Sequence, residues 1–354
     1  PVRLKMKSAK SPLFLILATV IAAACLIYAL RQRENMVEES RLAMGTIVQI
    51  KVPLRPGLDK KAADYAIDRA FDEIDRVEKV FSVYRQDSEI SRINGLKLGE
   101  EMKITTETFS LIERSVEYTK KTSGAFDITV YPLVRLWQDA RMSGRLPAVS
   151  EIKKALEKVG AANIILDKTK MTISFAKDGV AIDLGGVAKG YATDRAIKVL
   201  QEIGIRDAIV NSGGDIYCLG ARSKFRPWRV GIRHPRKSSE VFMELDVMDE
   251  AVVTSGDYEK YFTLEGRRYS HIIDPRTGYP VGDYIISATV VSEDTVRADM
   301  LATALCVLGR EGLKIVDSEK AMAAIVVKDG DKMKVEMAGN VRGSFRVYQK
   351  KLSQ

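Results

Sequence analysis

The feature that most constrains this sequence is an uncharged apolar run of 18 residues, Leu13 to Leu30. A run of this length is at the short end of what crosses a bilayer as a helix. It follows a basic leader, residues 1–12, and positive charge ahead of such a run favours a leader left in the cytoplasm and a body moved across the membrane. We therefore expect one N-terminal transmembrane helix, a tether over 31–40 and a folded domain over 41–350.

Two other interpretations of the apolar run remain open. A signal peptide cleaved near Ala22 to Ala24 would leave no anchor in the mature protein. A lipoprotein would use Cys25, but Ala22 fits such a site poorly and apolar residues continue beyond the cysteine. We prefer the retained anchor. All three interpretations place the folded domain on the extracytoplasmic side of a bacterial cell membrane.

The charge balance argues against a nucleic-acid-binding protein. The chain has 56 Lys and Arg against 47 Asp and Glu, a formal net charge of +9. Six of these net charges lie in residues 1–33, which contain no acidic residue. The remainder, near +3, is too weakly basic to attract a polyanion strongly.

The few cysteines and histidines limit the kinds of metal site. The three cysteines, Cys25, Cys218 and Cys306, form no CxxC pair and predict no disulfide framework. Only two histidines occur, His234 and His271, so a zinc or copper site built on imidazoles is not expected. A metal in this chain should be bound by oxygen.

The hydrophobic periodicity predicts a single α+β domain. Predicted helices cover 60–81, 106–122, 150–160, 187–203 and 297–308. Predicted strands cover 47–52, two segments of 172–184, 208–219, 285–291, the neighbourhoods of Val252, Phe262 and Tyr269, and a closing hairpin over 323–337. Strands and helices alternate too irregularly for a doubly wound parallel sheet.

Two segments carry groups suited to a phosphate and its metal. Asp183 to Gly190 (DLGGVAKG) leads from a strand into a helix, where backbone N–H groups and Lys189 can meet a phosphate. Asp299 and Thr303 lie four residues apart on one helical face, and such oxygen ligands suit Mg²⁺. Taken singly, each segment is better explained by structure alone, the first as a tight turn and the second as a capping or solvated Asp with a core-facing Thr.

Two further segments carry a candidate base and a candidate ring-binding surface. His271, in SHIIDPRTG, can act as a general base, or can simply be hydrogen-bonded within a turn. Tyr84, Phe126 and Trp137 can stack on a planar ring, although core packing is the default for Phe126 and Trp137.

Together and in this order, the segments resemble the ApbE family of FAD:protein FMN transferases over about Arg41 to Gly343. The matching pieces are Met44-Gly45-Thr46, Asp87 to Asn94, Gly124 to Asp127, Asp183 to Gly190, Thr254 to Tyr258, His271 to Gly278, and Ala298-Asp299 with Thr303.

The resemblance implies an α+β domain related to the T-fold and a defined set of site residues. Mg²⁺ would be held by Asp299, Thr303 and the carbonyl of Gly186, and His271 would be the base. The residues implied to line the FAD are Met44, Tyr84, Ala125, Phe126, Asp127, Asp183, Lys189 and Ser270.

The resemblance also implies a reaction and its partners. FMN would pass from FAD to a Thr or Ser hydroxyl of an acceptor protein, releasing AMP. Expected acceptors are flavoprotein subunits of Rnf-type or sodium-pumping NADH:quinone oxidoreductases, or other extracytoplasmic flavoproteins. Two alternatives use the same residues: a pyrophosphatase that cuts FAD to FMN and AMP, and a flavin-binding protein without catalysis.

Overall fold

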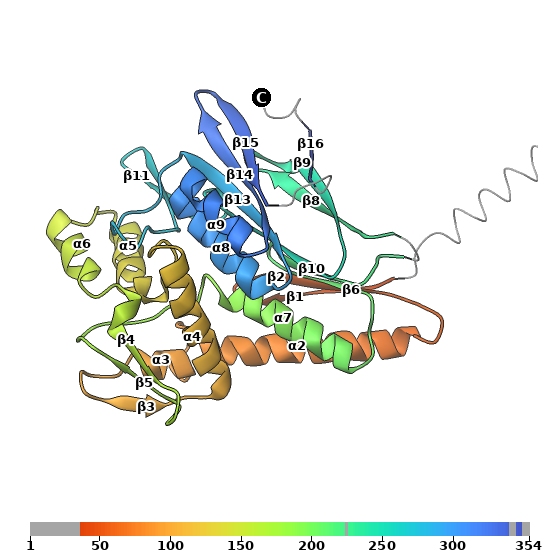
Figure 1. Cartoon of the computed structure of the whole chain (residues 1–354), viewed down its shortest axis with the longest axis horizontal. Coiled ribbons are helices and arrows are strands. Elements are labelled where there is room, and N and C mark those ends of the chain that lie inside the picture. The colour runs from red at the N-terminus through yellow and green to blue at the C-terminus, as the bar shows by residue number, and fades with distance from the viewer. Residues whose placement is uncertain (1–35, 224–225, 340–344, 349–354) are drawn as a thin grey trace, which may run out of the picture.

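Eight strands form one antiparallel sheet in the computed structural model, which describes residues 36–223, 226–339 and 345–348 (Figure 1). Their order is β1-β2-β6-β7-β10-β13-β14-β15. The strands are β1 (Met36–Ala43), β2 (Thr46–Pro53), β6 (Ala208–Ser212), β7 (Asp215–Leu219), β10 (Glu250–Gly256), β13 (Ile285–Ser292), β14 (Met322–Asp329) and β15 (Lys332–Ala338). The central strand β13 is buried along its whole length, so both faces of the sheet are covered.

Three helices cover one face of this sheet: α2 (Lys60–Phe81), α7 (Ala188–Glu202) and α8 (Thr295–Leu308). Helix α2 lies on β1, β2 and α7, while α7 lies on β6, β7 and α8 (Figure 1). Apolar residues recur at helical spacing along α2, and Ile67, Phe71 and Ile74 are fully buried. The Asp59 side chain caps α2 by accepting a hydrogen bond from Ala62 N at 2.8 Å.

A second, three-stranded sheet covers the opposite face. It contains β8 (Trp228–His234), β9 (Lys237–Val247) and β16 (Phe345–Val347). The two layers share one apolar cluster, to which β10 and β13 contribute Val252 and Val291. Their neighbours Val253 and Val290 point to the helical side, as the two-residue period of a strand requires.

Two smaller groups of elements complete the domain. One contains α3 (Glu89–Ile93), α4 (Thr106–Lys121) and the strands β3 (Glu101–Lys103), β5 (Thr172–Phe175) and β4 (Ile164–Asp167). The other joins α5 (Tyr131–Ser143) and α6 (Val149–Leu156) to the hairpin of β11 (Tyr261–Leu264) and β12 (Arg267–Ser270) around Trp137. The short elements are η1 (Ile128–Val130), η2 (Ala161–Asn163), η3 (Gly309–Gly312) and α9 (Leu313–Ser318).

The α+β class and the helices expected over 60–81, 106–122, 187–203 and 297–308 are confirmed within one to two residues at each end. The hairpin expected over 323–337 is also present, as β14 and β15.

Several expectations were wrong. Residues 36–40, assigned to the tether, belong to β1, which pairs with β2. Residues 172–184 contain one strand instead of two, and 208–219 contains two strands because Gly213 and Gly214, both with positive φ, reverse the chain. Helix α6 ends at Leu156, before the expected Gly160. Strands β8 and β9 and helix α5 had not been predicted.

The apolar run Leu13–Leu30, expected to span a membrane, lies outside the described residues. Among the residues that are described, no helix has the length and apolar character needed to cross a bilayer.

Candidate active site

Helices α7 and α8 approach each other closely at Gly190. A Cβ at this position would lie 2.7 Å from the carbonyl oxygen of Thr295 and 3.1 Å from Cβ of Asp299. Since real Cβ atoms do not approach backbone oxygen at that distance, a residue larger than glycine would push the helices apart. At this contact Gly190 N donates a hydrogen bond to Asp299 Oδ2 at 3.2 Å.

The same packing brings together the three residues expected to hold a metal. A Cβ on Gly186 would lie 3.6 Å from Thr303 Oγ1, so the loop before α7 faces the third turn of α8. Asp299 lies one turn before Thr303 on the same helical face. Gly186 also faces Phe126, whose ring would lie 3.3 Å from that Cβ.

Two buried carboxylates and one ammonium form the centre of the site. Lys189 Nζ lies 2.5 Å from Asp215 Oδ2 and 3.8 Å from Asp299 Oδ2. Asp215 and Asp299 are each only 2% exposed. When both carboxylates are ionised, the cluster therefore carries one uncompensated negative charge in a region with little water.

The pKa values of this cluster follow from that imbalance. Burial, reinforced by the neighbouring Asp215, raises the pKa of Asp299 well above its ordinary value, against the opposing effect of Lys189. Burial alone would favour the neutral amine of Lys189, but Asp215 and Asp299 raise its pKa, so the residue stays charged. An excess of buried anionic oxygen fits a hard divalent cation such as Mg²⁺.

The donor set is small for a metal site. As expected from the sequence, it would contain one carboxylate, from Asp299, together with the hydroxyl of Thr303 and the carbonyl of Gly186. No group of three or more His, Cys, Asp or Glu side chains placed to bind a metal occurs in the described part of the chain.

The loop before α7 is shaped by Asp183. Its side chain accepts a hydrogen bond from Gly185 N at 2.8 Å, and its own N–H donates to Ile128 O at 2.7 Å. Burial raises the pKa of the Asp183 carboxyl. This turn places Gly186 next to the segment that contains Phe126.

The expected flavin-lining residues 125–127 are buried beside this loop. Ala125 is 1% and Phe126 4% exposed. The Asp127 carboxylate accepts hydrogen bonds from Thr129 N and Thr129 Oγ1 and from Ala161 N, at 2.6–3.0 Å. Asp127 therefore fixes the local backbone, and its burial raises its pKa.

Met44 is half-buried against the main core, whereas Tyr84 is exposed. Met44 occupies the β1–β2 turn with φ of 53°, and its N–H donates to Glu78 Oε2 at 2.6 Å. Tyr84 is 76% exposed, and its hydroxyl lies 3.2 Å from Nε2 of Gln138. An exposed tyrosine ring leaves its face open to stack on a planar ligand.

His271 follows β12 and is held by one backbone carbonyl. The backbone N–H of His271 donates a hydrogen bond to Lys260 O at 3.0 Å, and the ring atom Nδ1 lies 2.8 Å from the same oxygen. Because a carbonyl only accepts hydrogen bonds, Nδ1 must carry the proton, which leaves a lone pair on Nε2 of the neutral ring. Ser270, also expected in the site, is buried and accepts a hydrogen bond from Ile272 N.

The ring of His271 is neutral at physiological pH. Part of the residue is exposed, yet desolvation by the surrounding protein lowers its pKa to about 4. The hydrogen bond to Lys260 O opposes this shift, while the charges of Lys260 and Lys189 add to it.

Two acidic residues of this site were not predicted as site residues. Asp215 lies at the start of β7, directly after the Gly213-Gly214 turn. Glu259 lies near Lys189, and desolvation, opposed by Lys189 and reinforced by Asp215, raises its pKa to about 7. No short motif marks either residue, since both join the cluster only through tertiary packing.

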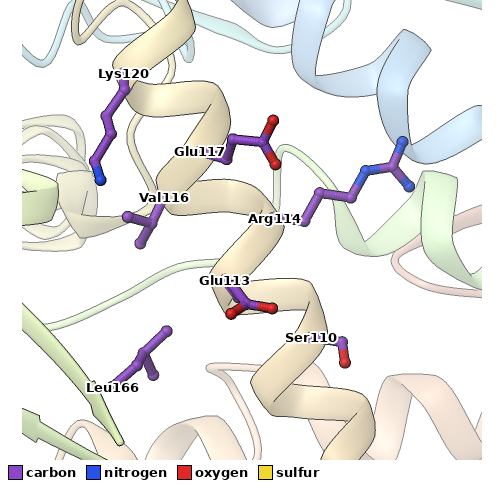
Figure 2. Close-up of a pocket in the computed structure, with 7 residues that line it drawn as sticks. All are labelled: Ser110, Glu113, Arg114, Val116, Glu117, Lys120 and Leu166. Carbon is purple, nitrogen blue, oxygen red and sulfur yellow. The ribbon is translucent and has the colours of Figure 1, made fainter. Parts of the chain in front are cut away.

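Two surface hollows lie outside the Asp215–Lys189–Asp299 cluster. One of about 560 Å³ is bounded by the exposed face of α4 and by Leu166, and it contains none of the expected site residues (Figure 2). A second hollow, of about 270 Å³, is lined mainly by residues between 274 and 285 and by Cys306. Cys306 lies one helical turn after Thr303 in α8.

Comparison with known proteins gives consistent matches. A sequence profile of the ApbE family matches residues 44–326. The FAD:protein FMN transferase of Vibrio cholerae is 33% identical over 89% of this chain and 94% of its own length. The Escherichia coli protein of the same name is 30% identical over 87% of this chain and 88% of its own length.

Solved structures agree with these matches. The ApbE protein of Thermotoga maritima superposes with a TM-score of 0.78 at 34% identity, covering 87% of this chain and 98% of that protein. The flavin transferase ApbE of Vibrio cholerae superposes with a TM-score of 0.78 at 32% identity, covering 88% of this chain and 99% of that protein.

The charge cluster generates a stability prediction. Lys189→Met leaves Asp215 and Asp299 without their ammonium and should lower the free energy of unfolding by about 2–3 kcal/mol at pH 7, less than for a fully buried pair because Lys189 is 28% exposed. Without the ammonium, the carboxyl groups of Asp215 and Asp299 have higher pKa values in the folded than in the unfolded protein. The folded variant therefore binds protons more readily as the pH falls, and its loss of unfolding free energy relative to the unaltered protein should become smaller between pH 7 and pH 5. Urea unfolding at both pH values measures this, with the exposed Lys198→Met on the same helix as control.

Proposed function

This chain belongs to the ApbE family, and on that basis we propose that it transfers FMN from FAD to a Thr or Ser hydroxyl of an acceptor protein, releasing AMP. It is an enzyme of the transferase class. The observation that carries the finer proposal is the pair of buried carboxyl groups of Asp215 and Asp299 beside the single ammonium of Lys189, together with the close approach of Gly186 to Thr303 on the helix that carries Asp299.

This charge excess supports Mg²⁺ as the cofactor. Asp299, Thr303 and the carbonyl of Gly186 would hold the ion, and the bound ion would neutralise charge on the FAD pyrophosphate. The amides at the start of α7 and the ammonium of Lys189 would bind and orient the phosphates, because a helix N-terminus carries partial positive charge. Tyr84, exposed at the rim, would stack on a ring of the dinucleotide.

His271 would act as the base for the acceptor hydroxyl. The hydroxyl oxygen attacks the phosphorus of the FMN half, and the bond from that phosphorus to the bridging oxygen breaks. AMP leaves with the bridging oxygen, and the hydroxyl proton passes to Nε2 of His271. The hydrogen bond from Nδ1 to Lys260 O fixes the tautomer that accepts this proton.

We also propose that the acceptor lies outside the cytoplasm, in flavoprotein subunits of Rnf-type or sodium-pumping NADH:quinone oxidoreductases or in similar proteins. The support is the basic leader followed by the apolar run Leu13–Leu30, whose pattern favours export of the domain into the extracytoplasmic space and attachment to the bacterial membrane.

The test is to incubate the full chain with FAD, Mg²⁺ and a candidate acceptor, and to weigh the acceptor. A mass gain equal to FMN on a Thr or Ser, with one AMP released per transfer, is the expected result. AMP release without that gain would indicate a pyrophosphatase, and intact FAD would indicate a binding protein. Either result would refute transfer to that acceptor.

Asp299→Ala should lower Mg²⁺-dependent turnover at least a hundredfold, because it removes the one carboxylate of the donor set. The increase in melting temperature that Mg²⁺ gives the unaltered protein should also be lost. The exposed Asp139→Ala is the control and should keep both properties. Full activity of Asp299→Ala at low Mg²⁺ would contradict the assignment of the metal.

His271→Ala should lower the transfer rate about 10²–10⁴-fold, the usual contribution of a general base, while the FAD dissociation constant changes less than twofold. With a pKa of about 4, His271 is unprotonated above pH 5, so this residue should limit the rate only in more acidic solution. Equal losses of transfer and FAD binding would instead mean that His271 has a structural role.

A further inference from the structure

Helix α8 contacts α7 and the loop before it at three positions with a regular spacing, and Figure 1 shows where the two helices lie. Gly186 faces Thr303 and Gly190 faces Asp299, as described above. Asp194 faces the N-terminus of α8. From one contact to the next, the position moves four residues forward in the segment 186–194 and four residues back in α8, from 303 to 295. The helices therefore run antiparallel, with one contact per helical turn.

Asp194 makes the third contact through both of its carboxylate oxygens. Oδ1 accepts a hydrogen bond from Thr295 N at 2.9 Å, and Oδ2 accepts one from Val296 N at 3.1 Å. Burial raises the pKa of Asp194 to about 6, and these two bonds oppose the shift. The residue is mainly ionised at pH 7, which makes both hydrogen bonds charge-assisted.

The two helices cap each other through these contacts. The N-cap residue of α7, Val187, provides no side-chain cap, and Asp299 of α8 accepts the hydrogen bond of Gly190 N instead. In return, Asp194 of α7 satisfies two of the first N–H groups of α8. The position of each helix along the other is thus fixed at both ends of the contact.

Asp294 holds the same end of α8 from another direction. Its side chain accepts a hydrogen bond from Arg297 N at 2.8 Å and is bound by Arg114 of α4 at 2.7 and 3.0 Å. Arg114 extends from the wall of the hollow on α4 (Figure 2). The ion pair of Arg114 and Asp294 connects α8 to α4. Asp194 instead connects α8 to α7, the helix that begins just after Gly186.

We propose that Asp194 is a positioning residue for the cation site, setting the register of α8 on α7 so that Asp299 and Thr303 face the carbonyl of Gly186. The proposal deepens the proposed function and rests on its assignment of these three groups to a cation. Asp194 itself does not touch the cation. One turn of helix separates it from Gly190, and Gly186 lies four residues before Gly190, in the loop that leads into α7.

The variant Asp194→Asn tests this, because an amide can accept one of the two N–H bonds but presents an NH₂ group to the other. The full chain is titrated with Mn²⁺ as a probe, followed by its electron paramagnetic resonance signal, in the absence of FAD. We expect a dissociation constant at least tenfold higher than that of the unaltered chain, the lower end of the cost seen when groups that orient metal ligands are lost, because a shifted α8 would move Asp299 and Thr303 relative to Gly186. FAD binding in EDTA, measured by flavin fluorescence, should change less than twofold.

A cap on another helix provides the control. Asp59→Asn alters the cap of α2, which accepts the hydrogen bond of Ala62 N, and should leave Mn²⁺ affinity unchanged. If Asp194→Asn does not fold, Thr295→Pro removes one donor to Asp194 at a helix position where proline is tolerated, and should weaken Mn²⁺ binding in the same direction.

Two results would overturn the proposal, and they are distinguishable. A folded Asp194→Asn or Thr295→Pro that binds Mn²⁺ as tightly as the unaltered chain would refute the positioning role and leave the proposed function intact. An unaltered chain that does not bind Mn²⁺ would refute the cation assignment itself, and the positioning role with it.

Discussion

The site depends on one steric constraint, the close approach of α7 and α8 at Gly190. With no side chain at this position, the backbone of α7 comes against the carbonyl of Thr295 and the side chain of Asp299. Gly186 and Thr303 then meet one turn further along. A larger distance between α7 and α8 would separate the groups that we assign to the cation, even if the strands of the sheet kept their pairing. The eight-stranded sheet beneath supplies the rigid surface on which this spacing is kept.

The charge of the cluster works against the stability of the free protein. When both are ionised, two carboxylates buried beside one ammonium leave an excess of negative charge. The raised pKa of Asp299 reflects the free-energy cost of ionising this carboxyl group in the folded protein. Packed apolar side chains in the same volume would be more stable. Such a destabilised arrangement is typical of functional sites, where stability is lost in favour of affinity for a ligand. Lys189 limits the loss, since it compensates one of the two charges.

Sequence patterns predicted the elements whose signal is local. Helix α2 was predicted over its exact bounds because its apolar residues keep a strict helical period, and the four-residue spacing of Asp299 and Thr303 placed both on one face of a helix. Residues 36–40 were missed because an edge strand alternates weakly and its polar residues resemble a tether. Asp194, Asp215 and Glu259 have no local signature. Their roles arise only when segments distant in the sequence pack together, which a single sequence does not reveal.

The reciprocal capping of α7 and α8 has a consequence for the order in which the molecule can be built. About one hundred residues separate the Asp183–Gly190 loop from Asp299 in the sequence. A chain that emerges from the ribosome N-terminus first exposes α7 with an incomplete first turn and an unpartnered carboxylate at Asp194, until α8 arrives. Contacts this distant form late because closing a long loop is entropically costly. Completion of the pocket should therefore wait for the docking of α8, and a nascent chain cut before that helix would lack a competent pocket.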